Sequence, residues 1–307
     1  MFDSTVRSEL EQAAGRTGSA DEPLAPFTTL GCGGPAALLL EVDSAERLQV
    51  VLSVAARRRV PWFILGRGSN LLVADAGWPG LALRLAGELK SFSIDGNRID
   101  SGGGATLARL AAAAAEAGLA GLEPLALIPG TAGGAVAMNA GAWSASMADV
   151  VAAVEVCLPS GRRVLPREEL VFSYRRCDLP PDAVVCRVEL ELAAGDPGAI
   201  RAAMKDYQSR RGGAQPVGGR SCGSVFRNPP GASAGELLDR AGCRGMRAGG
   251  AEISTVHANF IINHGSATAA DVLELMDRGR REVHERFGVV LEPEVKLLGD
   301  LSLEPLT

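Results

Sequence analysis

Residues 128–142 read Ile-Pro-Gly-Thr-Ala-Gly-Gly-Ala-Val-Ala-Met-Asn-Ala-Gly-Ala, and we expect the fold to be organised around this stretch. Most of its side chains are small, and its glycines let the backbone take a positive φ or approach a ligand without a Cβ in the way. Such a loop can direct amide N–H groups at an anion, for example the pyrophosphate of a dinucleotide. A plain glycine-rich turn between two packed elements explains the stretch equally well.

A second glycine stretch, Gly66-Arg67-Gly68-Ser69-Asn70, favours the anion-binding alternative. It lies between two apolar runs that are typical of strands. The dinucleotide fingerprint Gly-x-Gly-x-x-Gly opens a helix, whereas this turn enters a strand and lacks the third glycine. No Walker A sequence occurs either. The two stretches therefore indicate a nucleotide site outside the Rossmann and P-loop folds.

Several motifs, in their order and spacing, resemble one enzyme family. Thr29–Ala36, Gly66–Leu72 and Ile128–Ala142 look like the FAD-binding half of UDP-N-acetylenolpyruvoylglucosamine reductase, the MurB enzyme of peptidoglycan precursor synthesis. Further matching motifs downstream are Ser173-Tyr174-Arg175, Gln215-Pro216, Gly223–Pro229, His257–Phe260 and Leu291–Lys296. The chain is similar to the shorter subclass of this family, because neither of its two tyrosines lies in the inserted loop of the larger subclass.

The resemblance implies an α+β fold. After an N-terminal lead-in (1–25), we expect a PCMH-type FAD-binding region of the vanillyl-alcohol-oxidase kind (26–205), in subdomains of about 26–93 and 94–205. A smaller α+β C-terminal substrate domain (206–307) follows. The residue pattern agrees with this class, because predicted strands and helices mix without regular βαβ alternation.

Apolar periodicity and capping residues predict the individual elements. Helices are expected over residues 43–59, 106–117, 197–211, 234–241 and 269–287. Strands are expected over 37–42, 60–65, 81–85, 92–99, 150–157, 163–165, 184–192 and 289–298. The last strand would hold Glu294 rigidly. Residues 210–220, rich in glycine and arginine, are predicted to be a linker.

The resemblance also implies the cofactor and the reaction. NADPH would pass a hydride to N5 of FAD, and UDP-N-acetylglucosamine enolpyruvate would then take that hydride at C3 and a proton at C2, which gives UDP-N-acetylmuramate. FAD contacts are assigned by the motif match to Gly66, Arg67, Gly68, Ser69, Asn70, Gly130, Thr131, Gly133, Gly134, Ala135, Asn139, Gly141 and Ala142. Substrate contacts are assigned in the same way to Tyr174, Arg175, Gln215 and Asn259.

Three residues match the family's catalytic positions. Arg175 would bind the substrate carboxylate through its guanidinium and favour the enolate-like intermediate. Ser224 would donate the proton to C2, which hydride addition makes strongly basic. Glu294 would act at the substrate carboxyl group as an acid or by holding the intermediate. From the residues alone, Arg175 would be an ion-pair residue, Ser224 a turn serine and Glu294 a solvated strand residue.

The sequence departs from the family pattern at one phosphate-binding position. Many members carry a lysine before the Gln-Pro pair, where this chain has Ala214. Three nearby arginines, Arg210, Arg211 and Arg220, are candidate replacements.

The composition narrows the classes of partner that we expect this protein to bind. The net charge of −5 leaves no basic stripe, so we expect no nucleic-acid partner. The most apolar region, 105–127, contains charged residues and a proline, and residues 1–20 lack the apolar core of a signal peptide. We therefore expect a cytoplasmic protein with no membrane partner and no obligatory protein partner. Six cysteines without a C-x-x-C pair and three scattered histidines favour free thiols and no metal.

Rival functions remain open at this point. A related FAD oxidoreductase acting on another substrate would lack the pair Ser224 and Glu294, and a flavin-free binding protein would be colourless. A serine hydrolase is suggested by two Gly-x-Ser-x-Gly matches, around Ser221 and Ser233. A nucleophile elbow needs a strand directly before the serine and a helix directly after it, and neither match is predicted to have both.

Overall fold

The protein is described here by a computed structural model that covers residues 3–216 and 218–306. It separates into two compact units. Unit 1 comprises Met1–Ala20, Leu38–Gly66 and Gly80–Arg210, and unit 2 comprises Asp21–Ala37, Arg67–Pro79 and Arg211–Thr307. Two segments from early in the sequence, 21–37 and 67–79, thus pack with the C-terminal part of the chain.

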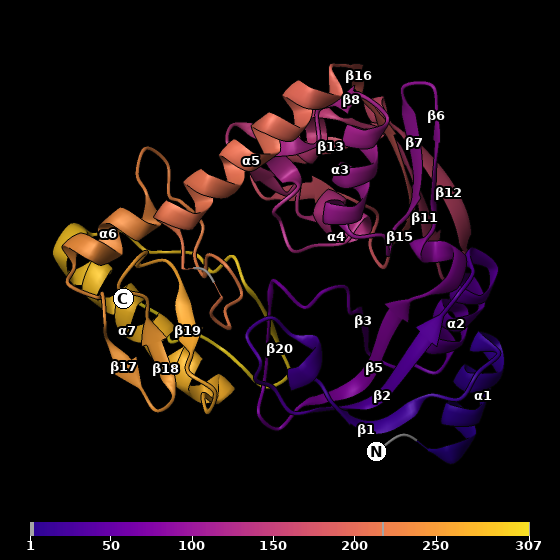
Figure 1. Cartoon of the computed structure of the whole chain (residues 1–307). Coiled ribbons are helices and arrows are strands. Elements are labelled where there is room, and N and C mark those ends of the chain that lie inside the picture. The colour runs from indigo at the N-terminus through magenta and orange to yellow at the C-terminus, as the bar shows by residue number, and fades with distance from the viewer. Residues whose placement is uncertain (1–2, 217, 307) are drawn as a thin grey trace. The chain divides into compact units, whose positions relative to one another are not determined.

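The first sheet is built from the N-terminal region (Figure 1). Its strand order is β1 (Ser19–Pro23), β2 (Pro35–Val42), β5 (Trp78–Leu85) and β3 (Trp62–Ile64), and β3 pairs with β5 in parallel. Two helices, α1 (Ser4–Ala14) and α2 (Ala45–Arg57), pack against each other. The predicted start of α2 is confirmed, because the side chain of Ser44 accepts a hydrogen bond from the N–H of Arg47.

The second sheet has five antiparallel strands. Its order is β12 (Gly161–Pro166), β11 (Val151–Leu158), β15 (Val184–Glu191), β7 (Arg98–Gly102) and β6 (Phe92–Asp95). The single strand predicted over 92–99 is wrong. Gly96 has φ of +56° and turns the chain between β6 and β7, which form a hairpin. Two helices, α3 (Leu107–Glu116) and α4 (Ala132–Ala137), share the apolar core of this sheet.

Short elements complete unit 1. Three small hairpins or pairs are β8 (Leu119–Ala120) with β16 (Ala193–Ala194), β9 (Gly141–Ala142) with β10 (Ala145–Ser146), and β13 (Val171–Ser173) with β14 (Arg176–Asp178). Single 3₁₀ turns of this unit lie at Gly87–Lys90, Glu123–Leu125, Met147–Asp149 and Arg167–Glu169, and a further one, Ala25–Phe27, lies in unit 2. Unit 1 contains two apolar clusters, and the one that holds the first sheet also includes Cys157, Val184 and Cys186 of the second sheet.

The helix α5 (Pro197–Ala214) is longer than predicted. The expected linker from residue 210 begins instead after this helix. Gly212 and Gly213 continue the helical hydrogen bonding, and the N–H of Gln215 still donates to the carbonyl of Arg211 at 3.0 Å. Glycine lowers the stability of a helix without forbidding it, so Gly212 and Gly213 did not mark the C-terminal end of α5.

Unit 2 combines a small antiparallel sheet with two helices. The sheet order is β17 (Arg247–Ala248), β18 (Ala251–Ile253) and β19 (Ile261–Asn263), and the helices are α6 (Ala234–Arg240) and α7 (Ala269–Phe287). The predicted bounds of α7 are confirmed by a capping box between Thr268 and Asp271 and by Gly288 at φ of +67°. Its apolar stripe is buried in the core of the unit.

A parallel pair of strands joins two segments of unit 2, 67–79 and 211–307. The strand β20 (Lys296–Leu298) pairs with β4 (Leu71–Val73). The strand predicted over 289–298 is therefore much shorter, and Glu294 lies before it. Pro293 cannot donate a ladder hydrogen bond and forms only an isolated bridge with Phe226.

In residues 3–216 and 218–306, we find no helix with both the length and the apolar character needed to cross a membrane. All six cysteines are buried and present free thiols.

Candidate functional site

The stretch 128–142 contains a helix where the sequence predicts a loop. The side chain of Thr131 caps α4. The N–H groups of Ala132 and Gly133 donate to carbonyl oxygens in the turn 103–105, each at 2.8 Å. These two amides are thus used within the chain, so they are not the donors that an anion would meet.

The glycines of this stretch fall into two kinds. A Cβ on Gly133 would lie 2.8 Å from the carbonyl oxygen of Val185, and one on Gly141 would lie 2.7 Å from a backbone oxygen across the β9–β10 hairpin. By contrast, Gly130 and Gly134 have no backbone atom in the way of a Cβ within 4 Å. The first pair is required by packing, whereas the second pair leaves the backbone accessible to a ligand.

The turn after β3 offers open donors. The N–H groups of Arg67, Gly68 and Ser69 make no hydrogen bond within residues 3–216 and 218–306. Gly68 has φ of +60°, and a Cβ there would lie 2.2 Å from the carbonyl oxygen of Phe27. Successive free amides around a positive-φ glycine form a concavity for anions, so this turn suits a pyrophosphate better than α4 does.

Residues of the two predicted cofactor stretches meet inside unit 1. A Cβ added to Gly66 would lie 3.1 Å from Oγ1 of Thr131. Two alanines assigned to the cofactor, Ala135 and Ala142, lie in α4 and β9, and Ala135 is buried.

Two asparagines assigned to the cofactor bond the backbone of other segments. Nδ2 of Asn70 donates to the carbonyl oxygen of Glu294 at 3.0 Å. Nδ2 of Asn139 donates to the carbonyl oxygen of Ser173 at 2.9 Å, and its Oδ1 accepts from the N–H of Ala148 at 3.1 Å. Each side chain therefore holds a segment that carries a predicted site residue.

Arg175 lies in the turn of the β13–β14 hairpin. Its φ is +57°, and Nη1 donates to the carbonyl oxygen of Gly141 at 3.0 Å. The guanidinium carbon is 5.2 Å from the ring centroid of Tyr174, a cation–π distance, and Tyr174 is 53% exposed. Unit 1 thus brings the predicted carboxylate-binding arginine next to the predicted cofactor stretch.

Ser224 and Glu294 come together in unit 2. Ser224 forms an isolated bridge with Phe260. The next residue, Val225, accepts a hydrogen bond at its carbonyl oxygen from the N–H of Glu294, at 2.8 Å. Two of the three predicted catalytic residues therefore lie on neighbouring backbone segments.

Asn259 is buried beside this pair. Its Oδ1 accepts from the N–H of Phe226 at 2.9 Å, and its Nδ2 donates to the carbonyl oxygen of Phe226 at 2.8 Å. The side chain predicted to contact the substrate is engaged with the backbone next to Ser224.

In the predicted motifs of unit 2, two buried polar atoms lack a hydrogen-bond partner in the part of the chain that the structure describes. They are Oε1 of Gln215 and Nε of Arg227. A buried unpaired polar atom is costly unless a ligand satisfies it. Gln215 is an assigned substrate residue, whereas Arg227 was missed, although a basic residue inside the 223–229 motif was a visible signal.

The candidate replacements for the family lysine differ in availability. Arg210 forms an ion pair with Asp206 at 2.8 Å, and burial lowers the pKa of Arg211. Arg220 is exposed and has no ion pair among the described residues, so it is the most available of the three.

Comparison with known proteins identifies the family. Residues 36–165 match the FAD binding domain, and residues 215–298 match the C-terminal domain of UDP-N-acetylenolpyruvoylglucosamine reductase. The reductase of Anaeromyxobacter sp. (strain K) is 45% identical over 302 residues, which are 98% of this chain and 92% of the relative. The chain belongs to the UDP-N-acetylenolpyruvoylglucosamine reductase family.

Other members of the reductase family agree in sequence and structure. A reductase of Symbiobacterium thermophilum is 46% identical and covers 91% of each chain. The crystal structure of the Thermus caldophilus reductase matches with a TM-score of 0.79 and 43% identity over 90% of this chain and 97% of that one. The predicted α+β fold, with a PCMH-type FAD-binding region and a reductase-type C-terminal domain, is confirmed.

The serine hydrolase alternative finds no support in this reductase fold. Ser233 is the N-cap of α6 and follows a turn, and Ser221 lies in a loop with no helix directly after it. Neither serine has the strand, turn and helix of a nucleophile elbow.

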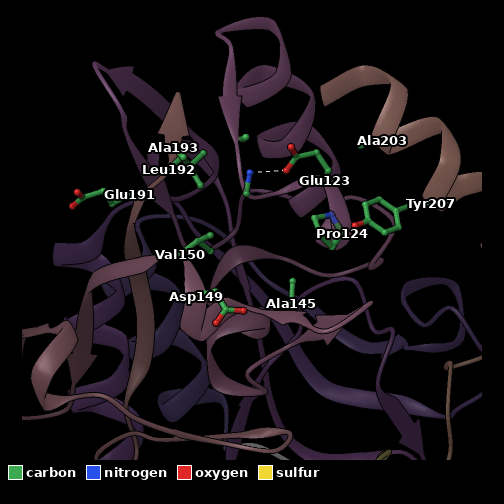
Figure 2. Close-up of a pocket in the computed structure, with 12 residues that line it drawn as sticks. Glu123, Pro124, Ala145, Asp149, Val150, Glu191, Leu192, Ala193, Ala203 and Tyr207 are labelled. Atoms are coloured by element: carbon green, nitrogen blue, oxygen red, sulfur yellow. Dashed lines mark hydrogen bonds between the residues drawn. The ribbon is translucent and has the colours of Figure 1, made fainter. Parts of the chain in front are cut away.

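A pocket of about 630 Å³ lies in unit 1, and none of the residues that line it is assigned to the reductase site (Figure 2). Its three carboxylates bond the protein itself: Glu123 accepts from the N–H of Gly121 at 2.6 Å, Asp149 from the N–H of Ser146 at 2.7 Å, and Glu191 from Nη2 of Arg98 at 3.2 Å. Tyr207 from α5 forms part of the wall and packs on Trp143. These carboxylates are engaged by the protein itself, so we assign the pocket no role.

Proposed function

We propose that this chain is an FAD-dependent enzyme that uses NADPH to reduce UDP-N-acetylglucosamine enolpyruvate to UDP-N-acetylmuramate. Its membership of the reductase family over nearly its whole length supports this activity. The observation that carries the residue assignment is the hydrogen bond from Glu294 to Val225, because it sets Glu294 beside Ser224.

FAD fits the residues that we assign to it. The open N–H groups of Arg67, Gly68 and Ser69 supply donors for the pyrophosphate, and Gly130 and Gly134 permit close approach to the backbone. The bound flavin supplies hydride transfer, which no side chain of the protein can perform.

Arg175 would bind the substrate carboxylate. Its hydrogen bond to Gly141 and its contact with Tyr174 fix the guanidinium, and a fixed guanidinium can bind a carboxylate through two parallel hydrogen bonds. The same positive charge stabilises the negative charge that develops when a hydride reaches the enolpyruvyl group.

Ser224 would donate the proton to C2 of the substrate, and Glu294 would act at the substrate carboxyl group. A hydroxyl is a weak acid, but it suffices when the accepting carbon is strongly basic and the donor is held in place. Arg220, Arg227 and Gln215 are proposed for the polar parts of the nucleotide sugar, since their groups are exposed or buried without a partner in the described chain.

The remaining assignments are proposals of the same kind. We propose a cytoplasmic enzyme with no nucleic-acid, membrane or obligatory protein partner, which the net charge of −5 and the free thiols support. The division into an FAD-binding region (26–205) and a substrate domain (206–307) stays a prediction.

Product analysis tests the proposed activity. The purified protein is incubated without oxygen with NADPH and UDP-N-acetylglucosamine enolpyruvate, and the nucleotide is analysed by mass spectrometry. We expect a product heavier by two hydrogens, with equimolar consumption of NADPH. Flavin reduction by NADPH without this product would instead favour a related FAD oxidoreductase with another substrate.

A further inference from the structure

Asn259 makes a dense set of hydrogen bonds to the residues that follow Ser224. Its side-chain amide pairs with both the N–H and the carbonyl group of Phe226, at 2.9 and 2.8 Å. Its own carbonyl oxygen accepts from the N–H of Val225 at 2.9 Å. The side chain is buried, with 2% of the residue exposed. Asn259 thus fixes the backbone on the C-terminal side of Ser224.

Asn259 is itself held by His257. The N–H of Asn259 donates to Nδ1 of His257 at 3.2 Å, and the imidazole packs edge-on against Phe260 at 5.0 Å between ring centroids. Burial lowers the pKa of His257, so at neutral pH the ring is uncharged and Nδ1 can accept this bond. Nearby Gly235 leaves room for the ring, because a Cβ there would lie 2.6 Å from Cε1 of His257.

The same backbone segment also receives Glu294. Val225 is bonded to Asn259 through its N–H and to Glu294 through its carbonyl oxygen, at 2.8 Å. Asn259 therefore bonds the segment through which Ser224 and Glu294 are kept next to each other. A displacement of about 1 Å between reacting groups can lower a rate about 100-fold.

We propose that Asn259 is a positioning residue of the reductase reaction, which acts by fixing Ser224 and not by contacting the substrate. This inference rests on the proposed function above. Oδ1 and Nδ2 of Asn259 are both already bonded to the backbone of Phe226. Asn259 therefore acts on Ser224 through this backbone segment.

The test separates the two half-reactions of the FAD-loaded enzyme by anaerobic stopped-flow absorption. In Asn259→Ala, bleaching of the flavin by NADPH should stay within about twofold of wild type, while return of the colour with the enolpyruvyl nucleotide slows by about 10- to 100-fold. If Asn259 acts through Ser224, adding Asn259→Ala to Ser224→Ala should slow that second step by less than about twofold further.

Asn263 provides a matched control in the same unit. It is also a buried asparagine, and its Nδ2 donates to the carbonyl of Leu30 at 2.9 Å while its Oδ1 accepts from the N–H of Gly265 at 2.7 Å. Asn263→Ala should lower the melting temperature about as much as Asn259→Ala, because each leaves buried backbone groups unpaired. It should leave the ratio of the two half-reaction rates as in wild type.

A second variant, Asn259→Asp, keeps the shape of the side chain and so guards against misfolding of the alanine variant. A neutral carboxyl group can reproduce both bonds to Phe226, whereas a carboxylate cannot donate, and burial favours the neutral form. The rate of the second half-reaction in Asn259→Asp, divided by the wild-type rate at the same pH, should therefore rise as the pH falls.

A structural readout does not depend on turnover. Hydrogen–deuterium exchange of the peptide containing Val225 and Phe226 should be faster in Asn259→Ala than in wild type and unchanged in Asn263→Ala. Equal slowing of both half-reactions, or undiminished slowing in the Ser224→Ala background, would overturn the positioning role. If even wild-type flavin does not regain its colour with the nucleotide, the proposed function itself fails, and the inference fails with it.

Discussion

The backbone N–H of Glu294 donates a hydrogen bond of 2.8 Å to the carbonyl oxygen of Val225, the residue next to Ser224. This bond brings together two backbone segments that lie far apart in the sequence. It comes from two irregular segments and not from a regular sheet, since Glu294 lies before β20 and Ser224 forms only an isolated bridge. The local geometry around Ser224 and Glu294 thus depends on a few specific hydrogen bonds.

Ser224→Ala should separate the half-reactions. Reduction of the flavin by NADPH should be unchanged, whereas reoxidation by the enolpyruvyl nucleotide should slow by about 10² to 10⁴, the usual contribution of a positioned acid. Anaerobic stopped-flow absorption measures both steps. Ser233→Ala is the control, because it removes the cap of α6 and should cost about 1 kcal/mol of stability without changing the ratio of the steps. Equal loss in both steps would contradict a role for Ser224 as proton donor.

Arg175→Ala should reduce turnover by about 10²- to 10³-fold while the FAD content of the purified protein stays close to that of wild type. The reason is that its guanidinium is assigned to the substrate carboxylate. Arg176→Ala is the matched control, because the neighbouring Arg176 is exposed and pairs with Asp178 at 2.5 Å. Steady-state kinetics and the flavin-to-protein absorbance ratio measure the two quantities. Loss of flavin without a larger loss of turnover would place Arg175 in cofactor binding.

Two adjacent glycines of α4 should respond differently to alanine. Gly133→Ala pushes a Cβ onto the carbonyl of Val185 and should lower the free energy of unfolding of the FAD-free protein by about 1–3 kcal/mol. Gly134→Ala should leave that free energy unchanged or raise it, because alanine favours a helix, yet it should weaken FAD binding. Urea unfolding and fluorescence titration with FAD give the two values. Wild-type FAD affinity in Gly134→Ala would show that this glycine does not face the cofactor.

Alkaline pH should destabilise the protein through its buried thiols. Burial, with a smaller effect of Asp178, raises the pKa of Cys177 from 9.0 to about 11. Between these values the unfolded thiol loses its proton and the folded thiol keeps it, so stability falls as the pH rises from about 9 to 11. Cys177→Ser lacks this titration and should lose less stability over that range, by on the order of 1–2 kcal/mol. Urea unfolding across this range measures the difference, and parallel curves would contradict the raised pKa.

Regular elements were predictable because their signals are local. The caps of α2 and α7 and the apolar stripe of α7 fixed those helices from short stretches of sequence. The motifs that resemble the reductase family also predicted the fold, because their order and spacing are visible in the sequence itself.

The details of the site were not predictable, because they depend on distant partners. Nothing in residues 128–142 shows that the amides of Ala132 and Gly133 bond the turn 103–105. Likewise, Asn139 and Asn259 look like ligand contacts in their motifs, but their partners, Ser173 and Phe226, are remote in sequence. A side-chain amide can serve a ligand or the backbone, and only the tertiary structure decides between them.

The most direct test of the central assignment is the visible absorption spectrum of the purified protein under anaerobic conditions, before and after NADPH and then after UDP-N-acetylglucosamine enolpyruvate. We predict flavin bands that bleach with NADPH and return with the nucleotide in the absence of oxygen. Bands that bleach and do not return would contradict the substrate assignment. A colourless protein that FAD cannot reconstitute would contradict the assignment as a flavoenzyme.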